Sequence, residues 1–592
     1  MQFALFGVVA VITIVGATAF GAKLGVAAPL LLVVVGIAYS YFPGAPTIHI
    51  EPDWILLIVL PPLLYAAAIT VPVVDFRRNL STISALSVGL VLVSALVTGF
   101  VVYAILPNLN LGYAIALGAV ISPTDVVAAT SIGKRIGLPP RLLAILEGEG
   151  LVNDATALVL LRTAVAAGAL STTKAFSIWP AVGDFFYAAA AAVVIGLIIG
   201  FITVRVRSWL KDPVLDTAVS FAVPFIAFIP AEEIHASGVI AVVVAGLYSG
   251  HNSAKRFTPQ VRISERVNWR TVQFILENGV FLLMGAQLRG IINDVATSRE
   301  PINAVQAVLI GLLAAVILIV LRFVFVGPLL VLVRRQSDRR ERDHLRWGER
   351  LEVFLRLTSA DSRRAITDAR LKRRQDQVQL QYDRRSNDLT QLRAEGLGWR
   401  GGVVLSWTGM RGVVTLAAAQ SLPDNDSIPY RPQLILIAFT VAIVTLLLQG
   451  STLPLVIRLT RIKGVDVIED RRSLASLLDE IGEAGLAVLD HPELALASGE
   501  AYDPAALERV RQDTLISAEA TWERAENGDD VNAIASSPHQ QYRTLRRQVL
   551  QAERQALLAA RSRGDYPSRV LGRAQAFLDL EEARIQQIDD QG

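Results

Sequence analysis

The chain contains no cysteine and few charged residues for its length. Of its 592 residues none is cysteine, only 18% are charged, and 53% are hydrophobic. The lack of cysteine excludes disulfides, cysteine-ligated zinc and thiol chemistry, although it does not identify a compartment. So little charge in so apolar a chain excludes a single soluble core. We expect a membrane protein that needs no cofactor and binds no nucleic acid.

Two further absences restrict the function. The N-terminus lacks a basic region ahead of its first apolar run, so we expect a first spanning helix and not a cleaved signal. No Gly-x-Gly-Asp motif lies within an apolar run, and there is no metal-binding histidine pair. These absences argue against an intramembrane protease, and we expect no enzyme activity. A transporter and a non-transporting sensor both remain possible at this point.

Long apolar runs recur along most of the chain. A helix needs roughly 17 to 25 apolar residues to cross a bilayer, and about thirteen runs have this character. Their approximate spans are 3–20, 24–42, 54–74, 82–106, 111–131, 142–169, 181–204, 214–231, 236–250, 271–288, 303–333, 402–420 and 433–458. The pattern predicts an all-α, polytopic membrane domain over residues 1–460.

Basic residues are unequally divided between alternate loops. Counting from the loop after the first span, one set holds fourteen: Lys23, Arg77, Arg78, Lys134, Arg135, Arg141, Arg205, Arg207, Lys211, Lys255, Arg256, Arg262, Arg266 and Arg270. The other set holds four: Lys174, Arg289, Arg299 and Arg431. The positive-inside rule therefore places the N-terminus outside and the C-terminus in the cytoplasm of a cell-membrane protein.

Thirteen spans divide into six, a linker and six, which predicts two inverted repeats. Each half has a polar interruption within a span, Ser122-Pro123-Thr124-Asp125 in the fifth and Gly409-Met410-Arg411-Gly412 in the twelfth. Discontinuous helices at matching positions of two repeats indicate a transport site near the middle of the membrane. We expect these two broken helices to cross.

Two charged segments lie outside the apolar runs. Residues 334–400 predict a charged, helical cytoplasmic insertion, and residues 461–592 predict a helical cytoplasmic tail. Either segment could bind partners, lipid headgroups or a second protomer, and either could be a solvated appendage.

Three polar residues, Glu149, Asn153 and Asp154, interrupt the apolar stretch from Leu142 to Leu170. A charge at the centre of a spanning helix costs roughly 2.5 to 3.5 kcal/mol on insertion scales, so such residues usually pair or line an ion path. On a helix Glu149 and Asn153 share a face, whereas Asp154 lies about 140° from Glu149. We therefore expect the two carboxylates to have different roles.

Possible partners for these charges lie elsewhere in the apolar runs. Arg322 in the eleventh span is predicted to pair with Glu149; the alternative is that it extends to the headgroups. Asp125 suits the N-terminus of a half-helix and Arg411 suits a C-terminus, so we expect an Asp125–Arg411 contact. The alternative for Asp125 is a simple N-cap in a cytoplasmic loop. Thr124 could offer its hydroxyl and carbonyl oxygens to a cation.

Taken in order, the sequence Glu149-x-x-x-Asn153-Asp154 and the two interruptions resemble the signature sites of the monovalent cation:proton antiporter family, of the sodium/proton exchanger type and its bacterial branch. Further resemblances are Leu60-Pro61-Pro62-Leu63-Leu64, His235-Ala236-Ser237-Gly238-Val239 and Glu277-Asn278-Gly279-Val280-Phe281. The similarity covers residues 3 to 460.

The resemblance implies a homodimer with thirteen helices, in which a mobile core (about 82–169 and 303–458) moves against a dimer scaffold (about 3–74 and 214–288). It implies that Asp154 binds Na⁺ or H⁺ alternately, with Asn153 orienting it and Glu149 paired to Arg322. It further implies electroneutral one-for-one exchange, serving pH and sodium homeostasis.

Three positions depart from the family pattern. Gly150 follows Glu149 where serine is common, Ala66 replaces an acidic residue after Tyr65, and Val126 follows Asp125 where proline is common. Two oxygen ligands are thereby missing. We expect exchange of Na⁺, and Li⁺, for H⁺, with K⁺/H⁺ or non-selective monovalent cation exchange as the alternative.

Overall fold

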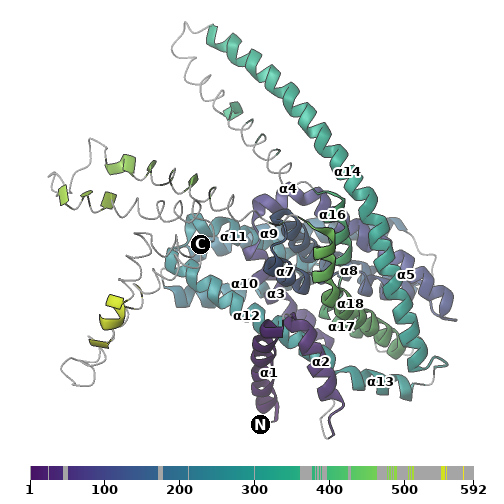
Figure 1. Ribbon diagram of the computed structural model, residues 1–592. Coiled ribbons are helices and arrows are strands. Elements are labelled where there is room, and N and C mark those ends of the chain that lie inside the picture. The colour runs from purple at the N-terminus through teal and green to yellow at the C-terminus, as the bar shows by residue number, and fades with distance from the viewer. Residues whose placement is uncertain are drawn as a thin grey trace. The chain divides into compact units, whose positions relative to one another are not determined.

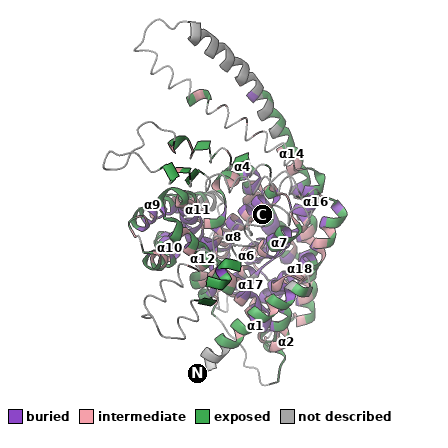
Figure 2. Ribbon diagram, turned by 60° about the vertical axis from the view of Figure 1, so that its left-hand side comes forward, coloured by how far each residue is buried: buried purple, intermediate pink, exposed green. Residues whose placement is uncertain are grey.

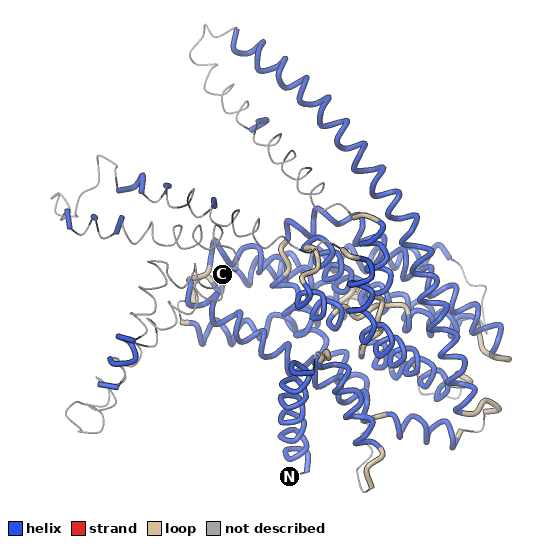
Figure 3. The backbone as a smooth tube through the Cα atoms, in the orientation of Figure 1, coloured by secondary structure: helices blue, strands red, loops and turns tan. Residues whose placement is uncertain are grey.

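The computed structural model describes residues 2–24, 26–43, 51–170, 178–210, 212–298, 300–360, 397–423, 428–462 and 464, with scattered residues between 377 and 389 and between 472 and 580. All regular secondary structure in these ranges is helical, as Figure 3 shows. The chain divides into two compact units, Met1–Gly464 and Val465–Gly592. The first unit contains every helix described below.

The helices are drawn in Figure 1. Their bounds are α1 (Gln2–Leu24), α2 (Ala28–Ser40), the π-helix η1 (Trp54–Val59), α3 (Leu60–Thr70), α4 (Val73–Ser84), the π-helix η2 (Ala85–Leu90), α5 (Val91–Ile105), α6 (Leu111–Ile121), α7 (Val127–Ile136), α8 (Pro140–Leu170), α9 (Ile178–Arg207), α10 (Pro213–Glu233), α11 (Gly238–Arg256), α12 (Pro259–Ala286), α13 (Leu288–Thr297), α14 (Ala304–Ala360), α16 (Trp399–Trp407), α17 (Val413–Gln420) and α18 (Arg431–Thr460).

Each of the thirteen predicted spans overlaps one or more helices. By length and composition, seven helical stretches within the described ranges can cross a membrane, and four shorter apolar helices accompany them. The fifth and twelfth spans are interrupted where polar residues predicted it, between α6 and α7 and between α16 and α17. The number of crossings and the inverted repeats stay predictions.

The predicted insertion at residues 334–400 does not begin with a new element. Helix α14 continues without interruption from the eleventh span to Ala360, as Figure 1 shows. Most of the remainder of this segment, and most of the predicted tail at residues 461–592, lie outside the described residues. Their predicted roles are therefore untested.

One set of helices packs around α11 and α12. Helix α11 lies against α3, α9 and α10, and α12 lies against α2. The α2–α12 contact depends on Gly36 and Gly285, since a Cβ on either would come within 2.3 Å of a carbonyl oxygen of the other helix. Small residues that let backbones approach are typical of helix pairs in membranes.

A second set packs around α8 and α18. Helix α6 lies between α5 and α8, and α18 lies against α14, α16 and α17. Within the apolar window of α18, 72% of residues are buried, against 28% for α14, and Figure 2 shows the purple buried residues gathered inside this part of the unit. Helix α18 thus forms the support on which α16 and α17 rest.

Candidate ion-binding site

The two helix breaks touch each other. Helix α6 ends at Ile121 and α7 begins at Val127, whereas α16 ends at Trp407 and α17 begins at Val413. Between them, the backbone N–H of Asp125 donates to the carbonyl oxygen of Met410 over 2.7 Å. A break leaves backbone groups unpaired, and this bond satisfies one group from each break. The two broken helices therefore meet as the sequence predicted.

Arg411 neutralises the C-terminal end of α6. Its guanidinium is 2% exposed and its Nε donates to the carbonyl oxygen of Ile121 over 3.1 Å. A second guanidinium nitrogen donates to the carbonyl of Gly409, and the backbone N–H of Arg411 donates to the hydroxyl oxygen of Thr445 over 3.1 Å. The last carbonyls of a helix carry partial negative charge, which explains why a buried cation is stable here.

The predicted contact between Asp125 and Arg411 is wrong. Asp125 uses Oδ1 to accept a hydrogen bond from the Val127 N–H at 2.8 Å, at the start of α7. No ion pair joins the two side chains among the described residues. The physical reason is that each charge binds a helix terminus of opposite partial charge. Asp125 does act as an N-terminal cap, but at the crossing and not in a loop.

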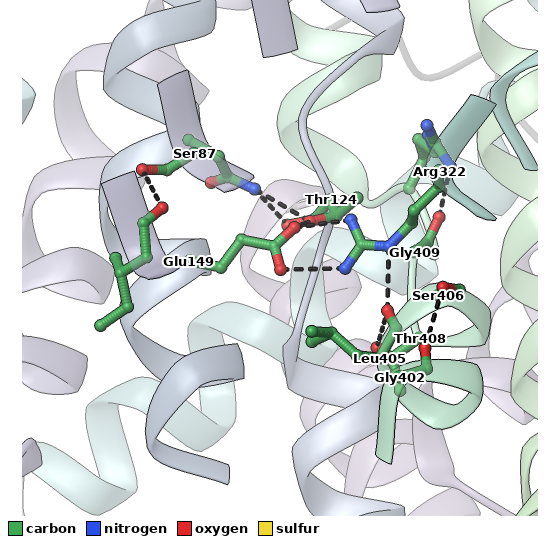
Figure 4. A network of polar contacts seen from close by, with 12 residues as sticks. Ser87, Thr124, Glu149, Arg322, Gly402, Leu405, Ser406, Thr408 and Gly409 are labelled. Atoms are coloured by element: carbon green, nitrogen blue, oxygen red, sulfur yellow. Dashed lines mark hydrogen bonds and ion pairs between the residues drawn. The ribbon is translucent and has the colours of Figure 1, made fainter. Parts of the chain in front are cut away.

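Glu149 and Arg322 form the buried ion pair that the sequence predicted. Two guanidinium nitrogens donate to the two carboxylate oxygens over 2.6 and 2.9 Å, and Nε donates to the Leu405 carbonyl over 3.0 Å. Both residues are 1% exposed, so Arg322 does not extend to the headgroups. Figure 4 shows this network beside Gly409, where a Cβ would lie 2.6 Å from Cδ of Arg322.

Thr124 links the first break to α8. Its hydroxyl donates to Oε1 of Glu149 over 2.7 Å, and the Asn153 amide donates to its carbonyl oxygen over 2.7 Å and to its hydroxyl oxygen over 3.1 Å. Glu149 and Asn153 thus act from one helix face, as their spacing predicted. A hydroxyl and a carbonyl oxygen each have two lone pairs, so Thr124 keeps acceptor capacity, and its role as a cation ligand stays a prediction.

Asp154 faces a cavity of about 410 Å³. Residues that line it include Thr124, Asp125, Val126, Thr130, Ser131, Lys134, Glu147, Gly150, Leu151, Asp154, Gln273, Glu277 and Gly412. Among the described residues, none donates a hydrogen bond or forms an ion pair with the Asp154 carboxylate. Lys134 is 62% exposed and pairs with Glu147 over 2.7 Å, which places the solvent side of the cavity at the N-terminal end of α8.

This geometry can be compared with known proteins. The sequence profile described as "sodium/hydrogen exchanger, transmembrane" matches residues 9–361 and 384–459. The chain belongs to the sodium/hydrogen exchanger family. It is a multi-pass membrane protein of the bacterial monovalent cation:proton antiporters, and it is a transporter, not a catalyst.

Curated relatives of this exchanger cover most of the chain. An uncharacterized Na⁺/H⁺ exchanger of Mycobacterium tuberculosis is 28% identical over 98% of this chain and 96% of its own length. A sodium, potassium, lithium and rubidium/H⁺ antiporter of Bacillus pumilus is 28% identical over 72% of this chain and 57% of its own length.

A solved structure has the same fold as this exchanger. The sodium proton antiporter MjNhaP1 of Methanocaldococcus jannaschii aligns with a TM-score of 0.53 and 15% identity, over 77% of this chain and 98% of that protein. At this identity the likeness concerns the fold alone.

Some polar groups of the exchanger site were not predicted as such. Glu277 and Gln273 of α12 line the cavity, and the Gln273 amide donates to the Glu277 carboxylate over 2.6 Å. The signal for Glu277 was present, because it lies in one of the further stretches that resemble the family. The Lys134–Glu147 pair could not be found from the sequence, since both residues resemble ordinary charges near a membrane surface.

Proposed function

We propose that the protein exchanges Na⁺ for H⁺ across the cell membrane, with Asp154 as the group that binds each in turn. One observation carries the proposal: of the two acidic groups in α8 near the crossing, Glu149 is bound on both oxygens by Arg322, whereas Asp154 faces the cavity unpaired. An unpaired carboxylate in a membrane protein marks an ion pathway.

The chemistry is competition for one carboxylate. Burial disfavours the bare anion, so Asp154 is stable when it holds either a proton or a cation. The loaded site is neutral in both cases, because the neighbouring charge of Glu149 is balanced by Arg322. The empty, charged site crosses slowly, and this couples the two fluxes. Exchange at one such carboxylate is one for one and electroneutral.

The crossing of the broken helices supports an elevator-type movement. Hydrogen bonds among Thr124, Asn153, Glu149 and Arg322 join the break between α6 and α7 to α8 and α14. These elements form one hydrogen-bonded body. We propose that this body moves against the helices around α11 and α12, which form the scaffold of a homodimer in the lipid bilayer. The N-terminus is outside and the C-terminus is cytoplasmic, and the exchange serves pH and sodium homeostasis.

A second candidate is K⁺/H⁺ exchange, or exchange without discrimination among monovalent cations. The observation that favours it is the apolar part of the cavity wall near Asp154, where Val126 and Gly150 provide no side-chain oxygen. The Bacillus pumilus relative, described as acting on sodium, potassium, lithium and rubidium, supports the same candidate. Hard oxygen ligands are what alkali and alkaline-earth cations require.

The test is reconstitution of the full chain in liposomes with an imposed pH gradient. We expect Na⁺ to dissipate the gradient in the wild type and to have no effect with Asp154→Asn. Asp294→Asn, which changes an exposed carboxylate on α13, serves as the matched control and should behave as wild type. Cation-driven proton flux that survives Asp154→Asn at the wild-type rate contradicts the proposal. Insensitivity to a clamped membrane potential tests electroneutrality.

A further inference from the structure

Val126 and Gly150 occupy one space in the cavity wall. Val126 lies just before α7 and Gly150 lies on α8, one turn before Asp154. A Cβ placed on Gly150 would come within 2.4 Å of Cγ2, 3.2 Å of Cγ1 and 3.4 Å of Cβ of Val126. The isopropyl group of Val126 therefore fills the place that a side chain at position 150 would take. The two departures from the family pattern form one packing contact.

This contact removes oxygen from the face that bears Asp154. Positions four apart on a helix are neighbours, so a side chain at position 150 would lie beside the Asp154 carboxylate. Instead, both Val126 and Gly150 line the cavity without a side-chain oxygen.

Several of the oxygens at the crossing near Asp154 are already in use. Glu149 is bound by Arg322, Thr124 holds Asn153, and Asp125 Oδ1 caps Val127. The Asn153 Oδ1 atom has no partner and is buried, but Asn153 does not line the cavity. At the crossing the protein thus offers a cation Asp154, the second oxygen of Asp125 and spare lone pairs of Thr124, while positions 126 and 150 add no oxygen. The hydroxyls of Thr130 and Ser131 line the cavity on α7, and water completes the coordination shell.

We propose that the Val126–Gly150 contact sets the cation selectivity of the exchanger, by keeping the bound ion partly hydrated. Sites discriminate among cations through the number and field strength of the protein oxygens that replace hydration water. A cavity of about 410 Å³ has room for several waters. Where water supplies most of the shell, the alkali cations Li⁺, Na⁺, K⁺ and Rb⁺ bind with similar strength. This inference depends on the proposed function of Asp154.

The test compares wild type with Val126→Ala, Gly150→Ser and the double variant V126A/G150S in liposomes. We measure the concentration of each alkali cation that gives half-maximal proton flux. In wild type we expect the Na⁺ and K⁺ values to agree within about threefold. Gly150→Ser alone is crowded and should be impaired, whereas the double variant has room for the hydroxyl. In the double variant, the Na⁺ concentration for half-maximal flux should fall about tenfold relative to that for K⁺. Val126→Ala alone should leave this ratio unchanged.

Two further variants keep the result decisive. Val126→Thr retains the shape of valine and adds a hydroxyl, so it should also favour Na⁺, even if the double variant does not fold. The pair I83A/G148S is the matched control, because a Cβ on Gly148 would lie 2.4 Å from Cδ1 of Ile83, away from the cavity lining. It should leave the Na⁺ to K⁺ ratio unchanged.

The outcomes separate the two proposals. If no cation drives flux in wild type, the proposed function is wrong. Two results would overturn the role of the contact while the role of Asp154 stands. One is a wild type that exchanges cations but prefers one by more than about tenfold. The other is that Val126→Thr and V126A/G150S are active with an unchanged Na⁺ to K⁺ ratio.

Discussion

Arg162 on α8 and Glu232 on α10 form an ion pair of 2.6 Å between Nη2 and Oε2. Arg162 lies two turns after Asp154 on α8. The α8 residues that line the cavity all precede Arg162 in the helix; they are Glu147, Gly150, Leu151 and Asp154. The pair therefore joins α8 of one group of helices to α10 of the other, outside the cavity lining. In an elevator it must break when the cavity opens to the opposite side.

We predict that Arg162→Gln and Glu232→Gln each shift the exchanger away from the state seen here. Arg162 is 58% exposed and Glu232 22%, so solvent screening limits the shift to about 1 kcal/mol, or roughly fivefold in population. Glutamine at position 232 can still accept the Gly238 N–H bond that Glu232 Oε1 accepts at 2.9 Å. Maleimide labelling of a cysteine introduced at Ser131, which lines the cavity, should slow in both variants. The effects of the two substitutions should not add; additive effects would argue against a shared contact.

Arg322→Met should destabilise the protein strongly. It leaves Glu149 buried without a partner, and breaking one side of a buried pair costs about 3 to 5 kcal/mol. The double variant Glu149→Leu with Arg322→Met should recover most of this loss, because it removes both charges. Thermal unfolding of the purified protein in detergent measures both. A single variant as stable as wild type is incompatible with the ion pair described here.

Gly412→Ala should abolish exchange. A Cβ at this position would lie 2.0 Å from Oδ2 of Asp125, so the crossing must separate or Asp125 must give up its cap on α7. Gly327→Ala on α14 is the control, since nothing lies within 4 Å of its Cβ position, and alanine costs nothing on a helix. Proton flux and detergent stability should fall for the first variant and be unaffected for the second.

Arg207→Met should lower the melting temperature of the helices around α10. Arg207 binds both oxygens of Asp216 over 2.9 and 2.7 Å and lies 2.8 Å from Glu265, with no exposed side-chain surface. Its loss leaves two buried carboxylates uncompensated, and the cost is about 3 to 5 kcal/mol or more. Arg205→Met, an exposed neighbour on the same helix end, should have little effect. Equal melting temperatures for the two variants would count against this role.

The orientation can be tested with single cysteines, because the chain has none of its own. With the N-terminus outside, a cysteine at Tyr41, which is 55% exposed after α2, should react with an impermeant maleimide in intact cells. A cysteine at Ser131 should react only in inside-out vesicles. The reverse pattern would show that the charge asymmetry of the loops was misinterpreted.

The sequence by itself determined the features that depend on local order. Hydropathy located the helices, and a proline and polar residues located the breaks at Ser122–Asp125 and Gly409–Gly412, because a chain in lipid must satisfy its backbone within each segment. The helical period alone separated Glu149 from Asp154. Even the Arg322 partner followed, since a buried cation needs an anion and few were present.

Only the tertiary structure decided which groups meet across the crossing. Arg411 binds the end of α6 and not Asp125, because two helix termini of opposite polarity lie within reach once the breaks are packed together. The contact of Val126 with Gly150 could not be inferred either. In the sequence these are two separate positions without a side-chain oxygen, and only the packing of α7 against α8 brings them into contact. Helical period and polarity can be read from the sequence of each segment, whereas the distances between helices are set by how all side chains pack.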